Sequence, residues 1–172
     1  MPMSIRKLTR ADAVAFREVR LRALREHPEA FTSSYEEDVA KPLENSVQRI
    51  DATSGNVFWG AFVDGELRGM IGLVRETRAK SRHSGDVVAM YVAPEWGRRG
   101  IGRDLLQHLI DHARDEFALE QLVLTVTRGN ASASELYRAA GFTTFGLEPR
   151  AIKVGGEYFD KEHMILFLQR TP

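Results

Sequence analysis

The segment WGRRGIGRDLLQHL, which runs from Trp96 to Leu109, joins a glycine-rich turn to the start of an amphipathic helix. Residues 97–103 contain three glycines and three arginines. The apolar run from Val87 to Ala93 precedes the turn and ends at Pro94, which cannot donate a hydrogen bond to a strand ladder. After the turn, the apolar residues fall on one helical stripe: Leu105, Leu106, Leu109, Ile110, Ala113 and Phe117. The sequence therefore predicts a strand, a turn and a helix in immediate succession.

A turn of this kind is a candidate anion site. It places free backbone N–H groups and the positive end of a helix dipole at one point, and the three arginines Arg98, Arg99 and Arg103 would add charge-assisted hydrogen bonds. The segment is not a P-loop, because no Gly-Lys-Ser/Thr follows. It is not a dinucleotide fingerprint either, because Leu105 stands where the third glycine is needed. A plain surface turn with exposed arginines remains the alternative.

The flanking sequence predicts the rest of the fold. Residues 56–74 form two apolar runs around Asp64-Gly65, which indicates a hairpin. Downstream of the predicted helix we expect a strand over 122–126, a short helix over 131–140 that Gly141 ends, and two strands around Gly155-Gly156. The order of helices and strands indicates an α/β fold with a mixed sheet, in which the central strand, helix and strand form the one clear parallel crossover.

A further helix is expected near the start of the chain. Thr9 and Asp12 are spaced as a capping box, and the helix they open would continue to about Glu26, before His27-Pro28. We expect the four arginines of this helix to lie mostly on its solvated surface: Arg17, Arg20, Arg22 and Arg25.

Composition excludes several classes of protein. The chain has 172 residues, 43% of them hydrophobic, which suits a single domain over 1–172 with a core able to support a pocket. Its 24 basic and 24 acidic residues leave no net charge, so we expect neither nucleic acid nor an anionic membrane as a partner. There is no cysteine, no secretory signal and no apolar stretch long enough to span a membrane, and we therefore expect a cytoplasmic protein.

Two spaced segments resemble a known family. VVAMYVAPEWGRRGIGRDLL, and about thirty residues later NASASELYRAAGF, look like the two signature segments of the GNAT superfamily of acetyl-CoA-dependent N-acetyltransferases. The family's phosphate loop has the form Gln/Arg-x-x-Gly-x-Gly/Ala, and here Gly97 replaces the first side chain while Gly100 and Gly102 match. Since the loop binds pyrophosphate mainly through main-chain N–H groups, we expect this change to weaken bracing of the loop and not to abolish binding. The resemblance is strong from Val87 to Phe142 and rests elsewhere on the order of elements.

The resemblance implies a fold and a co-substrate. It implies a mostly antiparallel sheet flanked by helices, with a central parallel strand pair that splays apart. The main chain of Met90, Tyr91 and Val92 would bind the pantetheine arm of acetyl-CoA, and the loop residues would hold the pyrophosphate: Arg98, Arg99, Gly100, Ile101, Gly102 and Arg103. The Met90 and Val92 side chains are expected to pack in the core. Asn130 should cap the short helix and reach the cofactor arm.

The resemblance also implies catalytic roles. An amine with a pKa of about 10.4 is unprotonated in only about one molecule in a few thousand at pH 7, so some group must take its proton. Asp86, at the start of the strand that leads into the loop, is the candidate base. A polar residue at a strand mouth is the simpler interpretation of it. Tyr137 falls at the family's usual position for the acid that protonates the leaving thiolate, and a buried aromatic with a satisfied hydroxyl is the alternative.

The remaining candidates give weaker predictions. His108 and His112 lie four residues apart, but acidic neighbours indicate a solvated charged face, and we expect no metal site. The acceptor pocket of the family begins near the acidic run at residues 36–38, which nominates four residues for binding a cationic amine: Phe31, Tyr35, Glu36 and Glu37. A solvated charged face is the alternative interpretation of this run. The acceptor itself, a small molecule or a protein amine, is not readable from any motif.

Two other functions stay open on the sequence alone. One is a catalytically silent acetyl-CoA-binding module, and the other is a protein that uses the arginine loop for ATP or NAD. The apolar final strand, MILFL, also permits a homodimer.

Overall fold

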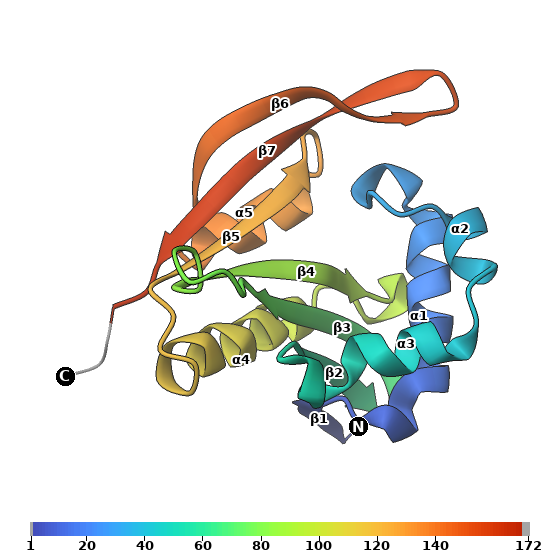
Figure 1. The fold of residues 1–172 in the computed structure, drawn as a ribbon. Helices are drawn as coiled ribbons and strands as arrows, with labels where there is room; N and C mark the ends of the chain where they lie inside the picture. Colours follow the sequence, from blue (N-terminus) through green and yellow to red (C-terminus); the bar gives the residue numbers. More distant parts are fainter. Residues whose placement is uncertain (1, 170–172) are drawn as a thin grey trace.

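The computed structural model describes residues 2–169, which form one seven-stranded sheet with helices on both faces (Figure 1). The elements, in chain order, are β1 (Met3–Lys7), α1 (Ala13–Glu26), α2 (Tyr35–Val39), α3 (Leu43–Ile50), β2 (Val57–Val63), β3 (Glu66–Arg75), β4 (Ser84–Val92), α4 (Ile101–Asp115), β5 (Gln121–Thr127), α5 (Ala131–Ala139), β6 (Thr143–Val154) and β7 (Glu157–Phe167). The strand order is β1-β2-β3-β4-β5-β7-β6. Each neighbouring pair is antiparallel except β4 and β5, which are parallel, so the predicted mixed sheet is confirmed.

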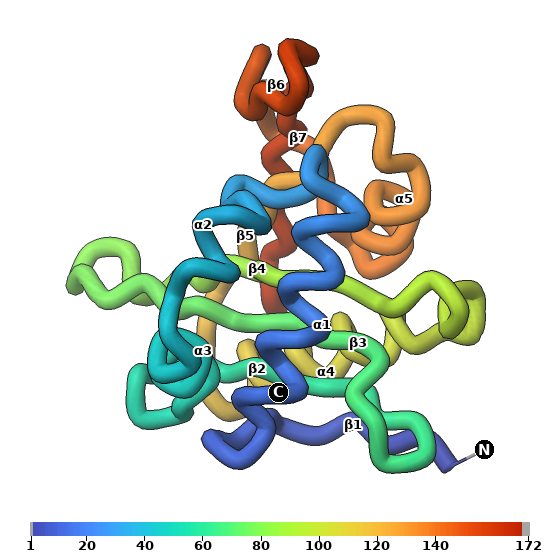
Figure 2. Tube along the Cα trace, turned by 90° about the vertical axis from the view of Figure 1, so that its right-hand side faces the viewer, coloured from blue at the N-terminus to red at the C-terminus, as the bar shows by residue number. Residues whose placement is uncertain are grey.

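Two apolar layers hold the helices to the sheet. On one face the apolar stripe of α4, including Leu105 and Leu109, packs against Trp59 and Leu73 of the strands. On the other face Phe16 of α1 and Ile50 of α3 belong to a second buried cluster. Figure 2 shows α1 crossing the near side of the sheet with α4 behind it. The amphipathic pattern after the glycine-rich turn therefore predicted the buried face of α4 correctly.

The predicted turns have the expected backbone geometry. Asp64 and Gly65 have φ angles of 50° and 81°, and Gly155 and Gly156 have φ angles of 56° and 84°. Two successive left-handed residues match the right-handed twist of hairpin strands. Gly141, at a φ of 105°, ends α5 as expected, and the amide of Phe142 after it donates to the carbonyl of Tyr137.

Three elements were not predicted from the sequence: β1, α2 and α3. β1 adds to the sheet edge beside β2. Its apolar residues Met3 and Ile5 alternate with polar ones, but the strand is only five residues long and mostly exposed. The short helix α2 is opened by a capping box between Ser34 and Glu37, which is visible in the sequence. Helix α3 follows Pro42 and buries Ile50. The capping box of the first helix is confirmed, because the amide of Thr9 donates to Asp12 Oδ2 at 2.8 Å.

Strand β7 lies between β5 and β6, so its backbone is paired on both sides. The homodimer suggested by its apolar residues stays a prediction. No helix within residues 2–169 has the length and apolar character needed to cross a membrane.

Candidate active site

The parallel strands β4 and β5 separate after a short contact. Their register covers only Ser84, Gly85 and Asp86 on β4, opposite residues 121–123 on β5 (Figure 1). Beyond Asp86, β5 continues along β7, whereas β4 continues along β3 with a bulge at Ala89, whose φ is 57°. The edge of β4 from Val87 to Val92 therefore turns unpaired backbone groups toward the space between the two strands. This is the splayed parallel pair that the family resemblance implies.

The loop after β4 is built to present backbone amides. Arg98 and Gly100 have φ angles of 60° and 80°, and Gly100 occupies the N-cap position of α4. The first helical hydrogen bond runs from the amide of Asp104 to the carbonyl of Gly100 at 3.0 Å, so the amides of the preceding turn have no acceptor within the helix. Alternating backbone conformations at a helix N-terminus make an anion-binding concavity. The arrangement agrees with the predicted anion site.

The arginine side chains of this loop are exposed. Arg99 lies over the ring of Trp96, with its guanidinium carbon 4.7 Å from the ring centre, and Arg103 makes one contact of 3.3 Å with Asp104. Surface contacts of this kind contribute little stability. The guanidinium groups can therefore turn toward a bound anion at small cost.

Gly102, in the first turn of α4, lies against the side chain of Met90 on the open strand. A Cβ atom placed there would lie 2.9 Å from the terminal methyl carbon of Met90. Only a glycine lets the helix backbone come this near to the β4 edge without moving that side chain. The loop amides and the open strand edge consequently adjoin one another.

A cavity of about 260 Å³ lies at the divergence of β4 and β5. Its walls come from β4, from the end of β5 and the start of α5, from the loop after α1, and from single residues of α1, α3 and β7. The lining residues are Arg20, Ala30, Phe31, Thr32, Ser33, Arg49, Val87, Val88, Ala89, Met90, Thr125, Val126, Thr127, Asn130, Ala133, Tyr137 and Lys161. Four of the predicted site residues are among them: Phe31, Met90, Asn130 and Tyr137.

Tyr137 lies on α5 with 6% of its surface exposed, and its ring packs edge-on against Phe142. Burial raises the pKa of its phenol above the ordinary value of 10.0. Its hydroxyl makes no hydrogen bond with any side chain or backbone group in the described part of the chain. Tyr137 lines the cavity, and its role as the acid that protonates the thiolate stays a prediction.

Asn130 caps α5 as predicted. Its side-chain oxygen accepts from the amide of Ala133 at 3.3 Å, and both residues line the cavity. The cap fixes the first turn of the helix that carries Tyr137.

Asp86 lies at the point of divergence, as the last residue of β4 paired with β5. It is half-buried, and burial raises the pKa of its carboxyl, with a further contribution from the negative charge of Glu76. Asp86 does not line the cavity. Its role as the base stays a prediction.

The acidic segment near α2 is arranged differently from the expectation. The carboxylate of Glu37 accepts from the amide of Ser34 and so caps its own helix, and the ring of Tyr35 faces the guanidinium of Arg25. Neither residue lines the cavity, and neither does Glu36; only Phe31 of the four predicted acceptor-binding residues does so.

Arg20 corrects a second expectation, because it is buried instead of solvated. Its Nε donates to Asp38 Oδ2 at 2.5 Å, and both side chains are only 9% exposed. Lys41 contacts the other oxygen of Asp38 at 2.8 Å. The sequence alone suggested a surface position for Arg20 because its partner Asp38 lies 18 residues away, on a helix that was not predicted.

Two cationic lining residues were missed altogether. Lys161 of β7 is 9% exposed, and its Nζ donates to Thr32 Oγ1 at 2.7 Å. Arg49 of α3 is half-buried, with its guanidinium 5.5 Å from the ring centre of Phe58. Neither residue belongs to a motif, and only the packing of α3 and β7 around the divergence brings them together.

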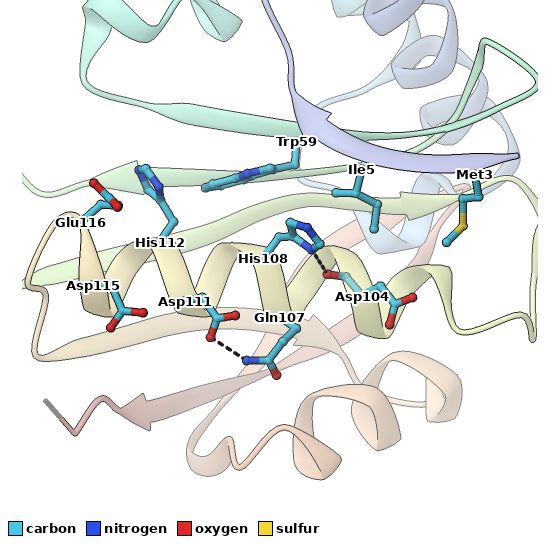
Figure 3. A pocket seen from close by; sticks show the side chains of 10 residues that line it. All are labelled: Met3, Ile5, Trp59, Asp104, Gln107, His108, Asp111, His112, Asp115 and Glu116. Carbon is cyan, nitrogen blue, oxygen red and sulfur yellow. Dashed lines mark hydrogen bonds between the residues drawn. The ribbon is translucent and has the colours of Figure 1, made fainter. Parts of the chain in front are cut away.

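A larger hollow lies elsewhere, between α4 and the edge of the sheet at β1 and β2 (Figure 3). His108 and His112 line it together with Trp59 and several carboxylates. The sequence alone predicted a solvated His112, and this prediction is wrong. The His112 ring packs edge-on between Trp59 and Phe117, at centroid distances of 5.3 and 4.5 Å. Burial lowers its pKa. No group of three potential metal ligands occurs within the described residues.

Comparison with known proteins agrees with this geometry. The model of the Acetyltransferase (GNAT) family matches residues 19–142. The N-alpha-acetyltransferase RimI of Mycobacterium tuberculosis is 31% identical over 155 residues, which are 90% of this chain and 87% of that protein. A ribosomal-protein-alanine N-acetyltransferase from Brucella melitensis superposes with a TM-score of 0.84 at 26% identity, over 96% of this chain and 99% of that chain. In fold, the chain is also similar to yncA of Salmonella typhimurium, a putative acetyltransferase whose structure was solved with acetyl-CoA. That comparison has a TM-score of 0.86 and 24% sequence identity, and it covers 100% of this chain and 97% of that chain. With the open β4 edge, the amide-rich loop and these matches together, the chain belongs to the GNAT family of acetyl-CoA-dependent N-acetyltransferases.

Proposed function

We propose that the protein transfers the acetyl group of acetyl-CoA to a primary amine by direct attack in a ternary complex. The observation that carries this proposal is Tyr137, a buried residue that lines the cavity at the splayed strand pair and whose hydroxyl has no hydrogen-bond partner in the described part of the protein. A protein that only bound acetyl-CoA would have no need of a proton donor at this point.

The open strand and the loop suit the two ends of the co-substrate. The unpaired backbone of Met90, Tyr91 and Val92 offers hydrogen bonds to the amides of a pantetheine arm, with the side chain of Tyr91 buried on the other side and held by Glu26. The amides and side chains of residues 98–103 would hold the pyrophosphate, as the left-handed Arg98 and Gly100 permit. The thioester then lies near Tyr137.

The chemistry follows from these positions. The unprotonated amine attacks the thioester carbonyl, the carbon–sulfur bond breaks, and the phenol of Tyr137 gives its proton to the departing thiolate. Protonation of the amine at pH 7 costs roughly 4 to 5 kcal/mol that a base must offset. We assign that base role to Asp86, whose raised pKa suits proton acceptance and whose place outside the cavity requires a water to carry the proton.

Release of free thiol from acetyl-CoA, measured with a broad panel of amines, tests the proposed transfer. Amine-dependent release is the expected result, and its absence with every amine would leave only the silent binding module. A thermal-shift competition tests the alternative that the loop binds ATP or NAD. CoA should stabilise the protein, and neither ATP nor NAD should displace the bound CoA.

A further inference from the structure

The cationic residues of the cavity carry an inference about the acceptor. Arg20, Arg49 and Lys161 come from α1, α3 and β7 and line the same space, whereas no aspartate or glutamate of the described chain lines it. This is the opposite of the acidic pocket that the sequence suggested. A cationic amine of high charge, such as a polyamine, would meet like charges there.

Only one of these three cations is neutralised by the protein. Arg20 is paired with Asp38, as described above. Lys161 has the hydroxyl of Thr32 as its partner, and the nearest acidic influence on it, Glu148, is engaged by His163 at 3.0 Å. Arg49 makes no ion pair or side-chain hydrogen bond with the described residues.

The remaining two positive charges are held at a cost. Burial lowers the pKa of Arg49 to about 10, with a smaller contribution from the positive charge of Arg20, and the negative charge of Asp38 opposes this shift only in part. Burial also lowers the pKa of Lys161, against a smaller opposing effect of Glu148. Removing a cation from water without a counterion is unfavourable, and buried charges in proteins are normally paired. A ligand group that brings negative charge to this end of the cavity would offset the free energy that burial of these cations costs.

The size of the cavity limits the distance between that anion and the reacting amine. The volume of about 260 Å³ is below the range of sites for drug-sized ligands, and it must also admit the acetyl end of the co-substrate. A carboxylate has two oxygens, and it can accept charge-assisted hydrogen bonds from a guanidinium and from an ammonium group. An acceptor whose anion and amine are separated by few bonds suits a cavity of this volume.

We infer that the acceptor is a small free amino acid, whose carboxylate is bound by Arg49 and Lys161 while its amine faces the thioester. This inference rests on the proposed function and names the substrate class of the same site. Phe31, on the wall next to Thr32, would contact the amino-acid side chain.

The test compares each of the twenty L-amino acids with its own carboxamide as acceptor, by thiol release from acetyl-CoA. The amide keeps the amine and the side chain and removes the negative charge. Hydrogen bonds to charged groups predict a preference for the acid of roughly ten- to a hundredfold in kcat/KM. The amide has the less basic amine and thus more free nucleophile at neutral pH, so amine ionisation biases the comparison against this result.

Lys161→Met and Arg49→Gln should each lower kcat/KM for the best amino acid by roughly tenfold or more and leave the value for its amide nearly unchanged. Lys153→Met on β6 and Arg78→Gln in the loop after β3 are matched controls, since both residues are exposed and neither lines the cavity. The controls should preserve the preference for the acid. The same amino acid should raise the melting temperature of the CoA complex more than its amide does, which gives a readout independent of turnover.

Several outcomes would overturn the inference. Amides acetylated as well as the acids, or a preference that persists in both cavity variants, would show that no carboxylate is bound there. Activity confined to polyamines or to peptide amines would overturn the inference and leave the proposed acetyl transfer standing. If no amine of any class released thiol, the proposed function itself would be wrong.

Discussion

Replacement of Tyr137 by phenylalanine isolates the proton that the mechanism requires. The ring that packs against Phe142 stays in place, with its centroid distance of 5.8 Å, and only the hydroxyl is lost. Because that hydroxyl has no hydrogen-bond partner in the described structure, its removal should change the free energy of unfolding by less than about 1 kcal/mol. Acetyl-CoA affinity should also survive, since the open strand and the loop are untouched.

Turnover, in contrast, should fall. General acids contribute about a hundred- to ten-thousandfold, and we expect the low end. The phenol is a weak acid here because burial raises its pKa, and the thiolate, with a pKa near 8.5, is a fair leaving group. A hundredfold loss corresponds to about 2.7 kcal/mol of transition-state stabilisation. Since the raised pKa keeps the phenol protonated through the neutral and mildly alkaline range, the loss should be the same from about pH 6 to pH 9.

The assay is steady-state kinetics on two donors, acetyl-CoA and a synthetic acetyl thioester whose thiol has a lower pKa. The deficit of Tyr137→Phe should shrink on the second donor, because that thiolate leaves without help. A variant within about twofold of the parent on acetyl-CoA would remove Tyr137 from the mechanism. An equal loss on both donors would make it a positioning residue.

Three further predictions follow from the same structure. Asp86→Asn should lower kcat most near neutral pH and less at high pH, where the amine deprotonates unaided. The variant should also raise the free energy of unfolding at pH 7, because a carboxyl whose pKa is raised in the folded protein destabilises that protein once the carboxyl is charged; this gain should fade below about pH 4. Profiles of rate against pH and urea titrations check these two effects. An equal loss of rate at every pH would indicate a structural role for Asp86. Gly102→Val should weaken acetyl-CoA binding in calorimetry while circular dichroism shows an intact fold, since its side chain would occupy the close approach to β4; unchanged affinity would contradict the loop assignment. Asp38→Asn should cost about 3 kcal/mol of unfolding free energy in urea because it leaves Arg20 buried and unpaired, whereas Glu95→Gln, in an exposed pair with an arginine, should cost less than about 1 kcal/mol; equal costs would mean that the buried pair adds nothing special.

The elements that the sequence predicted well share one property, which is that their signals are local. The stripe of α4, the left-handed turn at Asp64-Gly65 and the glycine stop after α5 each depend on residues within a few positions of one another. A hydrophobic period or a positive φ is imposed by the backbone of the segment itself, so it can be recognised without knowing the neighbours. The same reasoning predicts an anion site at the amide-rich loop around Gly100.

The missed elements have weak local signals or were obscured by charge. In β1 only Met3 and Ile5 alternate with polar residues, and this short edge strand gains its order from pairing with β2. The capping box at Ser34 does predict α2, but the acidic run after it drew attention to charge instead of to helix initiation.

The sequence by itself determined the strand, turn and helix around Gly100 and the short helix that carries Tyr137, because these depend on local backbone preferences and on two motifs of fixed spacing. The charge of the cavity at the divergence of β4 and β5 was decided only by the tertiary structure. Arg49 and Lys161 are 112 residues apart in the chain and share no sequence pattern. Both line one cavity only because α3 and β7 pack near the point where β4 and β5 diverge. The acidic residues near α2 looked closer to the site in sequence, yet they are used to cap a helix and to pair with Arg20. Long-range packing determines which charges face a cavity, and no local period records it.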